Sequence, residues 1–435
     1  MVNCSTVAES LFSYETPKIV QIKSILVGVI SRIIQLAILS YIIGYAIVYK
    51  KGYQEFSDVE SSVTTKVKGI AFTNFSNDDF NPKILHPEWY RRIWDVADFV
   101  IPPSENGATF IATNIIITAN QSQGTCPEDA SVPGAICDKR NNTCVEGKPF
   151  PTGNGVMTGV CIDNDYDNTI STCEINAWCP TEKDIFPLKN KTALLKASED
   201  FTIIFYVLSF FKLLHFYWNV FKLCIFIFSK WRNIKDTSDK SYLQNCLYDP
   251  EKASDCPIFR LGDIVRLSGQ KNYNDVASKG GVIAVVIKWD CNLDQDKTYC
   301  FPKYEFNRLD DPNAKLAPGW NFRYANYYHD DRRTLYKLYG IRLSISVVGQ
   351  AGKFRIVPLL TNIGAGLGLL ALEVVICDVV VLYLVKKHHF YKTKKYEEVD
   401  PEDEPLIIVP EMSGADSKTI ISTPDIGDQY QRLVD

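Results

Sequence analysis

Two long apolar runs, one toward each end of the sequence, limit most strongly what this chain can fold into. They occupy residues 27–49 and 356–385. At about 1.5 Å per residue, the first run forms a helix of roughly 34 Å, which is long enough to cross a bilayer. No short apolar run with a cleavage site precedes it, so we expect an uncleaved signal-anchor. The sequence therefore predicts a membrane protein with two transmembrane helices.

Basic residues and cysteines indicate the orientation of these helices. Residues 386–395, KKHHFYKTKK, follow the second run directly and favour a cytosolic C-terminus, whereas the basic residues beside the first run are divided between its two sides. Ten of the 13 cysteines lie between the runs, which indicates an oxidising compartment. Four N-glycosylation sequons lie in the same region, at Asn74, Asn120, Asn141 and Asn190.

Together these signals predict the order of segments along the chain. We expect residues 1–26 and 386–435 in the cytosol and residues 50–355 outside the cell, where they are numerous enough to bury a core. Residues 280–293 and 339–348 mix alternation with β-branched and aromatic residues, which is typical of strands. The acidic, proline-containing tail is expected to be disordered. The predicted fold class is a mainly β, disulfide-rich extracellular domain between two transmembrane helices.

Five polar residues on predicted strands have the chemistry of an anion site. Lys66 and Lys68 are two residues apart, so in a strand they project from the same face. Two ammonium groups at close range repel each other unless an anion joins them. Asn321 and Arg323 have the same spacing, Lys337 adds a cation, and the planar fork of arginine suits phosphate oxygens. By spacing alone, a solvated, charged strand face explains these residues more readily.

The second apolar run carries small and polar residues at helical spacing. Small polar residues suit a wet pore lining, although helix–helix packing explains the same stripe. Two carboxylates, Glu373 and Asp378, also lie in this run, where charge is costly and usually functional. Glu373 could face a pore and favour cations, or it could pair with Arg32. The stripe consists of Thr361, Asn362, Ala365, Gly368, Leu369 and Leu372.

Segments spread over nearly the whole chain resemble the ionotropic purinergic receptors, which are ATP-gated trimeric cation channels. The combination is far more specific than any single motif. The segments are YETPK (14–18), SSVTTKVKG (61–69), IWDVADFVIPP (93–103), WCPTE (178–182), CPIFRLGDIV (256–265), PGWNFRYANYY (318–328), GQAGKF (349–354) and YKTKK (391–395).

The resemblance implies a ligand, site residues and a disulfide pairing. It places a site for ATP between two subunits, where Thr202 meets the adenine and Phe322 points into the core. It makes the stripe on the second run the gate and matches Tyr391 to Lys395 with a trafficking motif. The residues implied to grip the phosphates are Lys66, Lys68, Asn321, Arg323 and Lys337. The implied disulfides are Cys126–Cys179, Cys137–Cys161, Cys144–Cys173, Cys246–Cys256 and Cys291–Cys300.

Residues 203–228 depart from the family pattern, because they form a third long apolar run inside the extracellular region. A third transmembrane span is disfavoured, since it would move four cysteines and Arg323 to the cytosol. A retained intron or faulty gene model is preferred over a genuine insertion that packs on the extracellular domain or touches the membrane surface. Cys224 is unpaired in the family scheme, which fits an extraneous segment. Residues 74–91 are a second departure, expected to be a surface insertion of little functional effect.

The predicted function is an extracellular ATP-gated, non-selective cation channel of the plasma membrane, homotrimeric or heterotrimeric. Na⁺, K⁺ and Ca²⁺ are the expected permeating ions, membrane lipid surrounds the helices, and the formal charge of −4 gives no reason to expect nucleic acid. No catalytic residue, metal ligand or cofactor is expected, and ATP acts as agonist.

Three alternatives belong to other functional classes or states. Residues 203–228 could make the chain inactive, or active only in heteromers. An ectonucleotidase would need acidic groups to hold a metal and activate water, and the basic pairs are expected to lack them. A proton-gated channel shares the two-span topology, but the cysteine spacing and the TKVKG and NFRYANYY segments argue against it.

Overall fold

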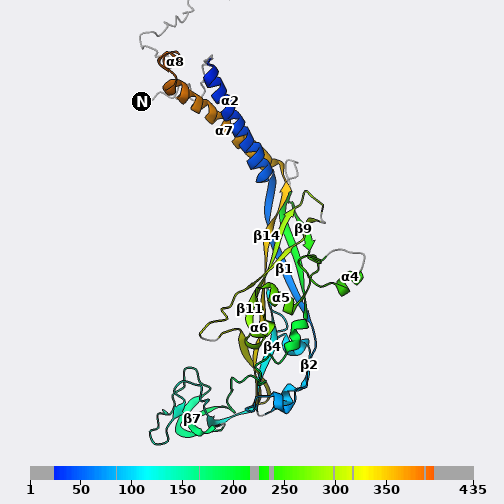
Figure 1. Cartoon of the computed structure of the whole chain (residues 1–435), viewed down its shortest axis with the longest axis vertical. Coiled ribbons are helices and arrows are strands. Elements are labelled where there is room, and N and C mark those ends of the chain that lie inside the picture. Colours follow the sequence, from blue (N-terminus) through cyan, green and yellow to red (C-terminus); the bar gives the residue numbers. More distant parts are fainter. Residues whose placement is uncertain are drawn as a thin grey trace, which may run out of the picture. The chain divides into compact units, whose positions relative to one another are not determined.

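The computed structural model describes residues 24–84, 86–165, 167–215, 225–234, 240–296, 299–315, 318–386 and 388–395 (Figure 1). It divides the chain into two compact units. One unit is Ile42–Gly364, and the other combines the segments Met1–Tyr41 and Ala365–Asp435. The predicted N-terminal segment up to residue 23 and the tail after residue 395 lie outside the described residues.

Two helices occupy the terminal apolar runs. The first, α2 (Ile25–Ser40), continues as a π-helical segment, Tyr41–Tyr49, and the second, α7 (Ile356–Val379), continues as another, Val380–Leu384. Both are long and apolar enough to cross a membrane. Their bounds differ from the predicted runs by two residues or fewer. A short helix, α8 (His388–Lys395), follows.

Between these helices the chain forms strands, with a few short helices. The strands are β1 (Gln54–Lys68), β2 (Ala71–Thr73), β3 (Arg92–Trp94), β4 (Ala108–Pro127), β5 (Ile136–Cys137), β6 (Val156–Asn164), β7 (Asp167–Cys179), β8 (Thr202–His215), β9 (Ile225–Arg232), β10 (Ile258–Arg260), β11 (Gly281–Asn292), β12 (Lys303–Arg308), β13 (Asn321–His329) and β14 (Arg332–Phe354). The helices are α3 (Val96–Phe99), α4 (Lys240–Asn245), α5 (Leu261–Leu267) and α6 (Tyr273–Lys279), with 3₁₀ turns at Asn77–Asp79, Pro87–Tyr90 and Lys196–Asp200.

The long strand β14 organises the main sheet, which has twelve strands among the described residues. It pairs with β1, β4 and β13 in the antiparallel sense and with β11 in the parallel sense. In β11, alternate residues from Ile283 to Trp289 are at most 1% exposed, which matches the alternation predicted for this strand. The buried faces of α5 and α6 join the same hydrophobic core. Figure 1 shows β1 and β14, the two strands next to the membrane helices in sequence, side by side.

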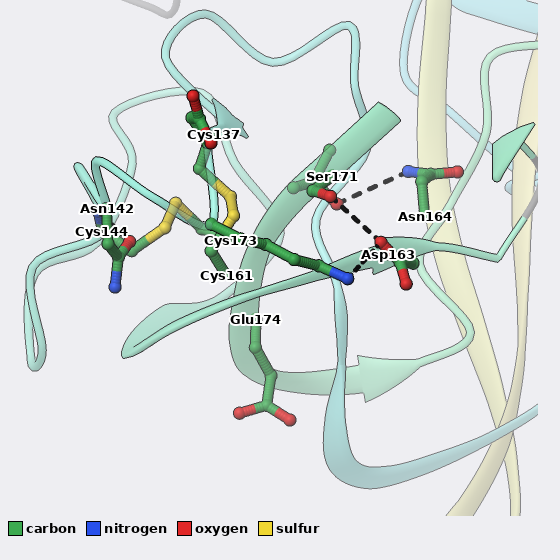
Figure 2. Close-up of a disulfide and its surroundings, with 12 residues drawn as sticks. Cys137, Asn142, Cys144, Cys161, Asp163, Asn164, Ser171, Cys173 and Glu174 are labelled. Carbon is green, nitrogen blue, oxygen red and sulfur yellow. Dashed lines mark hydrogen bonds and ion pairs between the residues drawn. A yellow bond between two sulfur atoms is a disulfide. The ribbon is translucent and has the colours of Figure 1, made fainter. Parts of the chain in front are cut away.

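Five disulfides hold the unit Ile42–Gly364, two of them within the block formed by residues 136–179, which contains β5, β6 and β7, and a third that joins this block to β4. This block has a small core of its own around Met157, Cys173 and Ile175. Beside it, the Asp163 carboxylate accepts a 3.0 Å hydrogen bond from Ser171 and pairs with Lys139 at 2.6 Å (Figure 2). The bonded pairs are those that the family resemblance implies: Cys126–Cys179, Cys137–Cys161, Cys144–Cys173, Cys246–Cys256 and Cys291–Cys300.

The third apolar run corrects one expectation and agrees with another. Residues 203–211 are not an extraneous segment, because β8 pairs with β1 from Lys68↔Thr202 to Val59↔Phe211. The run is not a third membrane helix in its described part either, since β8 and β9 form an antiparallel pair. Phe205, Val207 and Phe211 are at most 3% exposed and belong to the main core. Residues 216–224, which include Cys224, lie outside the described residues.

The loop over residues 74–91 is anchored more firmly than a surface insertion. Phe80 and Tyr90 are 3% and 1% exposed and pack in the main core. The hydroxyl of Tyr90 accepts a 2.8 Å hydrogen bond from the backbone N–H of Ile117. The four predicted glycosylation sites are all exposed, as attachment requires, and glycosylation itself stays a prediction: Asn74, Asn120, Asn141 and Asn190.

Candidate functional site

Lys66 and Lys68 project from one exposed face of β1, as their spacing predicts. Val67 between them is buried against the core at 8% exposure. Lys68 lies opposite Thr202 in the pairing of β1 with β8, so strand register alone brings the predicted adenine residue beside the predicted phosphate residues. The ammonium of Lys66 lies 5.8 Å from the centre of the Tyr206 ring, within cation–π range. Lys68 forms no ion pair within the described part of the chain.

Asn321, Arg323 and Lys337 form a second group on the β13–β14 hairpin. Arg323 lies directly opposite Lys337, and Asn321 lies opposite Tyr339. Residues two apart on one strand share a face, and residues directly opposite on paired strands share it too. Phe322 points the other way and packs on Phe110 with a ring-centre distance of 4.8 Å, as predicted.

Two carboxylates that the sequence did not assign hold the second group together. Glu182 accepts two hydrogen bonds from the guanidinium of Arg323, from Nε at 2.5 Å and from Nη2 at 2.9 Å. Lys337 Nζ lies 2.8 Å from Asp184 and 3.6 Å from Glu182. The side chains of Lys337 and Glu182 are 6% and 8% exposed, whereas those of Arg323 and Asp184 are 50% and 57% exposed, so the network is buried on one side and open to water on the other. Both carboxylates lie in the segment WCPTEKD, but the sequence alone does not show which residues they pair with.

The charges of this cluster reinforce one another. The hydrogen bonds to Glu182 raise the pKa of Arg323. Burial works against the charged form of Asp184, but hydrogen bonds from Lys337 and Tyr339 still lower the pKa of Asp184 below its ordinary value. Burial, and then the bond to Asp184, raise the pKa of the Tyr339 hydroxyl, which donates to that carboxylate at 2.6 Å. The cluster therefore joins two basic and two acidic side chains in one network.

The presence of two carboxylates overturns the expectation that no acidic groups lie beside the basic residues. Glu182 and Asp184 are both within ion-pair distance of the predicted phosphate-binding cations. Both are also engaged by those cations in the structure. An incoming polyanion must therefore compete with two carboxylates for Arg323 and Lys337.

The two groups of predicted site residues are not joined within one chain. In the described residues, no hydrogen bond or ion pair connects Lys66, Lys68 or Thr202 with Asn321, Arg323 or Lys337. Each group has its own strand pair, β1 with β8 for the first and β13 with β14 for the second. The predicted site residues of one chain thus fall into two separate groups, here called half-sites.

The predicted gate residues lie between residues 361 and 372 of α7, and one of them differs from the rest. Asn362 is only partly exposed, and its amide donates to the carbonyl of Gly52 at 2.7 Å and to that of Pro358 at 2.9 Å. The Asn362 side chain therefore ties the start of α7 to the end of the first span. The remaining residues of the stripe are all exposed in the chain: Thr361, Ala365, Gly368, Leu369 and Leu372.

Comparison with known proteins gives one consistent result. The family model for the ATP P2X receptor matches residues 12–398. Mouse P2X purinoceptor 4 is 44% identical over 412 residues, which cover 93% of this chain and 97% of the mouse protein. Human P2X purinoceptor 5 is 42% identical over 402 residues, which cover 91% of this chain and 84% of the human protein.

Solved structures agree with the sequence comparisons. A crystal structure of an invertebrate P2X receptor from the Gulf Coast tick, in the presence of ATP and Zn²⁺, is similar with a TM-score of 0.72 and 47% identity, covering 81% of this chain and 100% of that one. The chicken ATP-gated P2X7 receptor channel, with the competitive antagonist TNP-ATP, has a TM-score of 0.66 and 35% identity, covering 82% and 99% of the two chains.

Proposed function

The chain belongs to the family of ATP-gated P2X receptors, and on that premise we propose that its two half-sites hold extracellular ATP between neighbouring subunits. The chain is a subunit of an ATP-gated cation channel in the plasma membrane, with two spans and cytosolic termini, and the family is not enzymatic. The phosphate-binding residues are Lys66, Lys68, Asn321, Arg323 and Lys337, and Thr202 contacts the adenine.

The observation that carries this proposal is the division of the cations into two groups on separate strand pairs. Each group alone has two cationic side chains, whereas the two groups together supply four to a triphosphate that displaces Glu182 and Asp184. Because the family assembles as trimers, each of three contacts can join one half-site of each kind. ATP then binds more tightly when the halves approach each other, and this difference in affinity favours the open pore. Three sites add their contributions.

The pore assignment is also a proposal. The exposed stripe of α7 supports a gate that includes Thr361, Ala365, Gly368, Leu369 and Leu372, with Asn362 fixing the start of the helix. Asp378, the other carboxylate in this span, is a further candidate functional residue of the pore helix. We assign Na⁺, K⁺ and Ca²⁺ as permeating ions and lipid as the surroundings of α2 and α7. The predicted trafficking motif from Tyr391 to Lys395 lies in α8.

Expression of this chain alone tests whether it forms a working homotrimer. We expect an inward cation current when ATP is applied outside the cell, because β8 completes the sheet that carries Lys66 and Lys68 instead of disrupting it. Whole-cell recording is the measurement, with surface biotinylation in the same cells. Silence with normal surface protein would contradict this expectation and indicate a subunit that works only in heteromers.

Replacing Glu182 by glutamine is expected to lower the ATP concentration for half-maximal current. The change removes a carboxylate that competes with phosphate for Arg323 and Lys337. A hydrogen bond to a charged group contributes about 1.5–3 kcal/mol. Because glutamine retains part of these bonds, we expect the half-maximal ATP concentration to fall only about threefold to tenfold. Recordings at low Mg²⁺, where free ATP predominates, give the cleanest comparison. The matched control is Glu251→Gln, which changes an exposed glutamate in the loop between Cys246 and Cys256. A higher half-maximal concentration would show that Glu182 supports the site and does not compete with the ligand.

A further inference from the structure

Glu373 is a carboxylate inside the second membrane span, and the structure shows what accommodates it. Charge at such a position is costly and persists where it has partners or a function. Glu373 is 7% exposed. Its Oε1 accepts a 2.5 Å hydrogen bond from the hydroxyl of Ser31 on α2, and the sulfur of Cys377, one turn further along α7, lies 3.3 Å from the same oxygen.

Burial distinguishes Glu373 from the predicted gate residues of α7. Gly366, seven residues earlier, is the other buried residue of this helix, and seven residues are two helical turns. The two residues therefore share one face. Leu369 and Leu372, which belong to the predicted gate, are 39% and 50% exposed. Glu373 thus differs from these two gate residues in burial, although Leu369, four residues earlier, lies at a similar angle around the helix.

The partner helix offers polar groups at the matching height. Ser31 and Gln35 are four residues apart, so they share a face of α2. Arg32 donates to Gln35 Oε1 at 2.7 Å, which keeps its guanidinium on its own helix. In the described residues Arg32 forms no ion pair with Glu373, so the pairing considered from the sequence is replaced by the bond from Ser31.

We propose that the Ser31–Glu373 bond fastens the two spans of one subunit together, so that they respond as a pair during gating. Separating the helices would leave a carboxylate without its donor in an apolar medium, which is strongly disfavoured. Along the chain, α2 leads into β1 and α7 follows β14, so both routes from the ATP domain enter helices that this bond joins. Glu373 is therefore a positioning residue for gating and not a charge in the ion pathway.

The test uses the full-length chain with Ser31→Ala, Glu373→Leu, Glu373→Gln and the double variant Ser31→Ala/Glu373→Leu. ATP concentration–response curves, surface biotinylation and the reversal potential in Na⁺ and in Ca²⁺ are measured for each. We expect Ser31→Ala and Glu373→Leu each to raise the half-maximal ATP concentration about threefold to tenfold, the range for one hydrogen bond between membrane helices. The double variant should shift no further than the larger single shift.

Two comparisons make the result specific to the bond. Glu373→Gln keeps an oxygen acceptor for Ser31 and should stay close to the unmodified channel. Ser40→Ala, at an exposed serine on the same helix, is the matched control and should change nothing. If Glu373→Leu fails to reach the surface, Ser31→Ala against Ser40→Ala decides the question, because neither removes a charge.

Three results would overturn the proposal. Unchanged half-maximal concentrations in Ser31→Ala and Glu373→Leu would show that the bond has no part in gating. Additive shifts in the double variant would show that the two residues act separately. A changed preference for Ca²⁺ in Glu373→Gln would return Glu373 to the ion pathway. Failure of the ATP-site assignment would look different, since it concerns the response to loss of Lys66 or Arg323 and leaves these comparisons intact.

Discussion

Replacing Lys66 by alanine is expected to abolish the ATP-evoked current while leaving the channel at the cell surface. Lys66 is exposed on β1, and its one side-chain interaction among the described residues is the cation–π contact with Tyr206, so little folding energy depends on it. A hydrogen bond to a charged group contributes about 1.5–3 kcal/mol, and each of the three sites loses one such bond. Since 1.4 kcal/mol is about tenfold in affinity, occupancy of all three sites falls out of reach at ordinary ATP concentrations.

The measurement for Lys66 combines whole-cell recording with surface biotinylation. Lys252→Ala, which removes an exposed lysine from the loop between the paired Cys246 and Cys256, is the matched control and should respond normally. Arg323→Ala should give the same silence as Lys66→Ala if both half-sites are needed. Normal ATP responses in both variants would show that phosphate binds elsewhere.

Replacing Phe205 by alanine should destabilise the extracellular domain by about 3–5 kcal/mol, the usual cost of truncating a buried phenylalanine. Its ring is fully buried and lies 5.2 Å from that of Phe259 on β10. We expect a lower melting temperature of the detergent-solubilised protein and less channel at the surface.

Tyr206→Ala is the control for Phe205→Ala. Tyr206 is the next residue on β8 and is 41% exposed, so its truncation should leave the melting temperature nearly unchanged. Equal melting temperatures for the two variants would mean that β8 is not part of the folded core, and an extraneous origin for the run would regain support.

The elements that the sequence predicts well are those with a pattern readable over a single segment. The two membrane helices follow from the length of two predominantly apolar runs, and β11 follows from alternation. Lys66 and Lys68 share a face because they are two residues apart on a strand, and Val67 between them points into the core. β8 was misjudged for a physical reason: its outward face also carries apolar residues such as Ile204 and Leu208, so no alternation marks it as a strand.

The site was predictable where the resemblance assigned residues and incomplete where tertiary contacts decide. Glu182 and Asp184 lie just beyond β7, and only the fold brings them to Arg323 and Lys337, some 140 to 155 positions away. Asn362 looked like a pore residue because its polarity fits a wet lining. Its bond to the carbonyl of Gly52 depends on where the first span ends, and helical spacing contains no information about that.

The length of β14 has a mechanical consequence. From Lys337 to Phe354 this one strand covers 17 residue steps, about 56 Å at 3.3 Å per residue, and α7 begins two residues later. A strand that is already extended and paired on both edges lengthens little when it is pulled, so it transmits displacement along its axis. A pull at its ligand end is then delivered to the first turn of α7 with little lost to elongation. Substitutions that change gating are therefore expected near the two ends of β14, beside Glu182 and Asn362, and not in the middle of the strand.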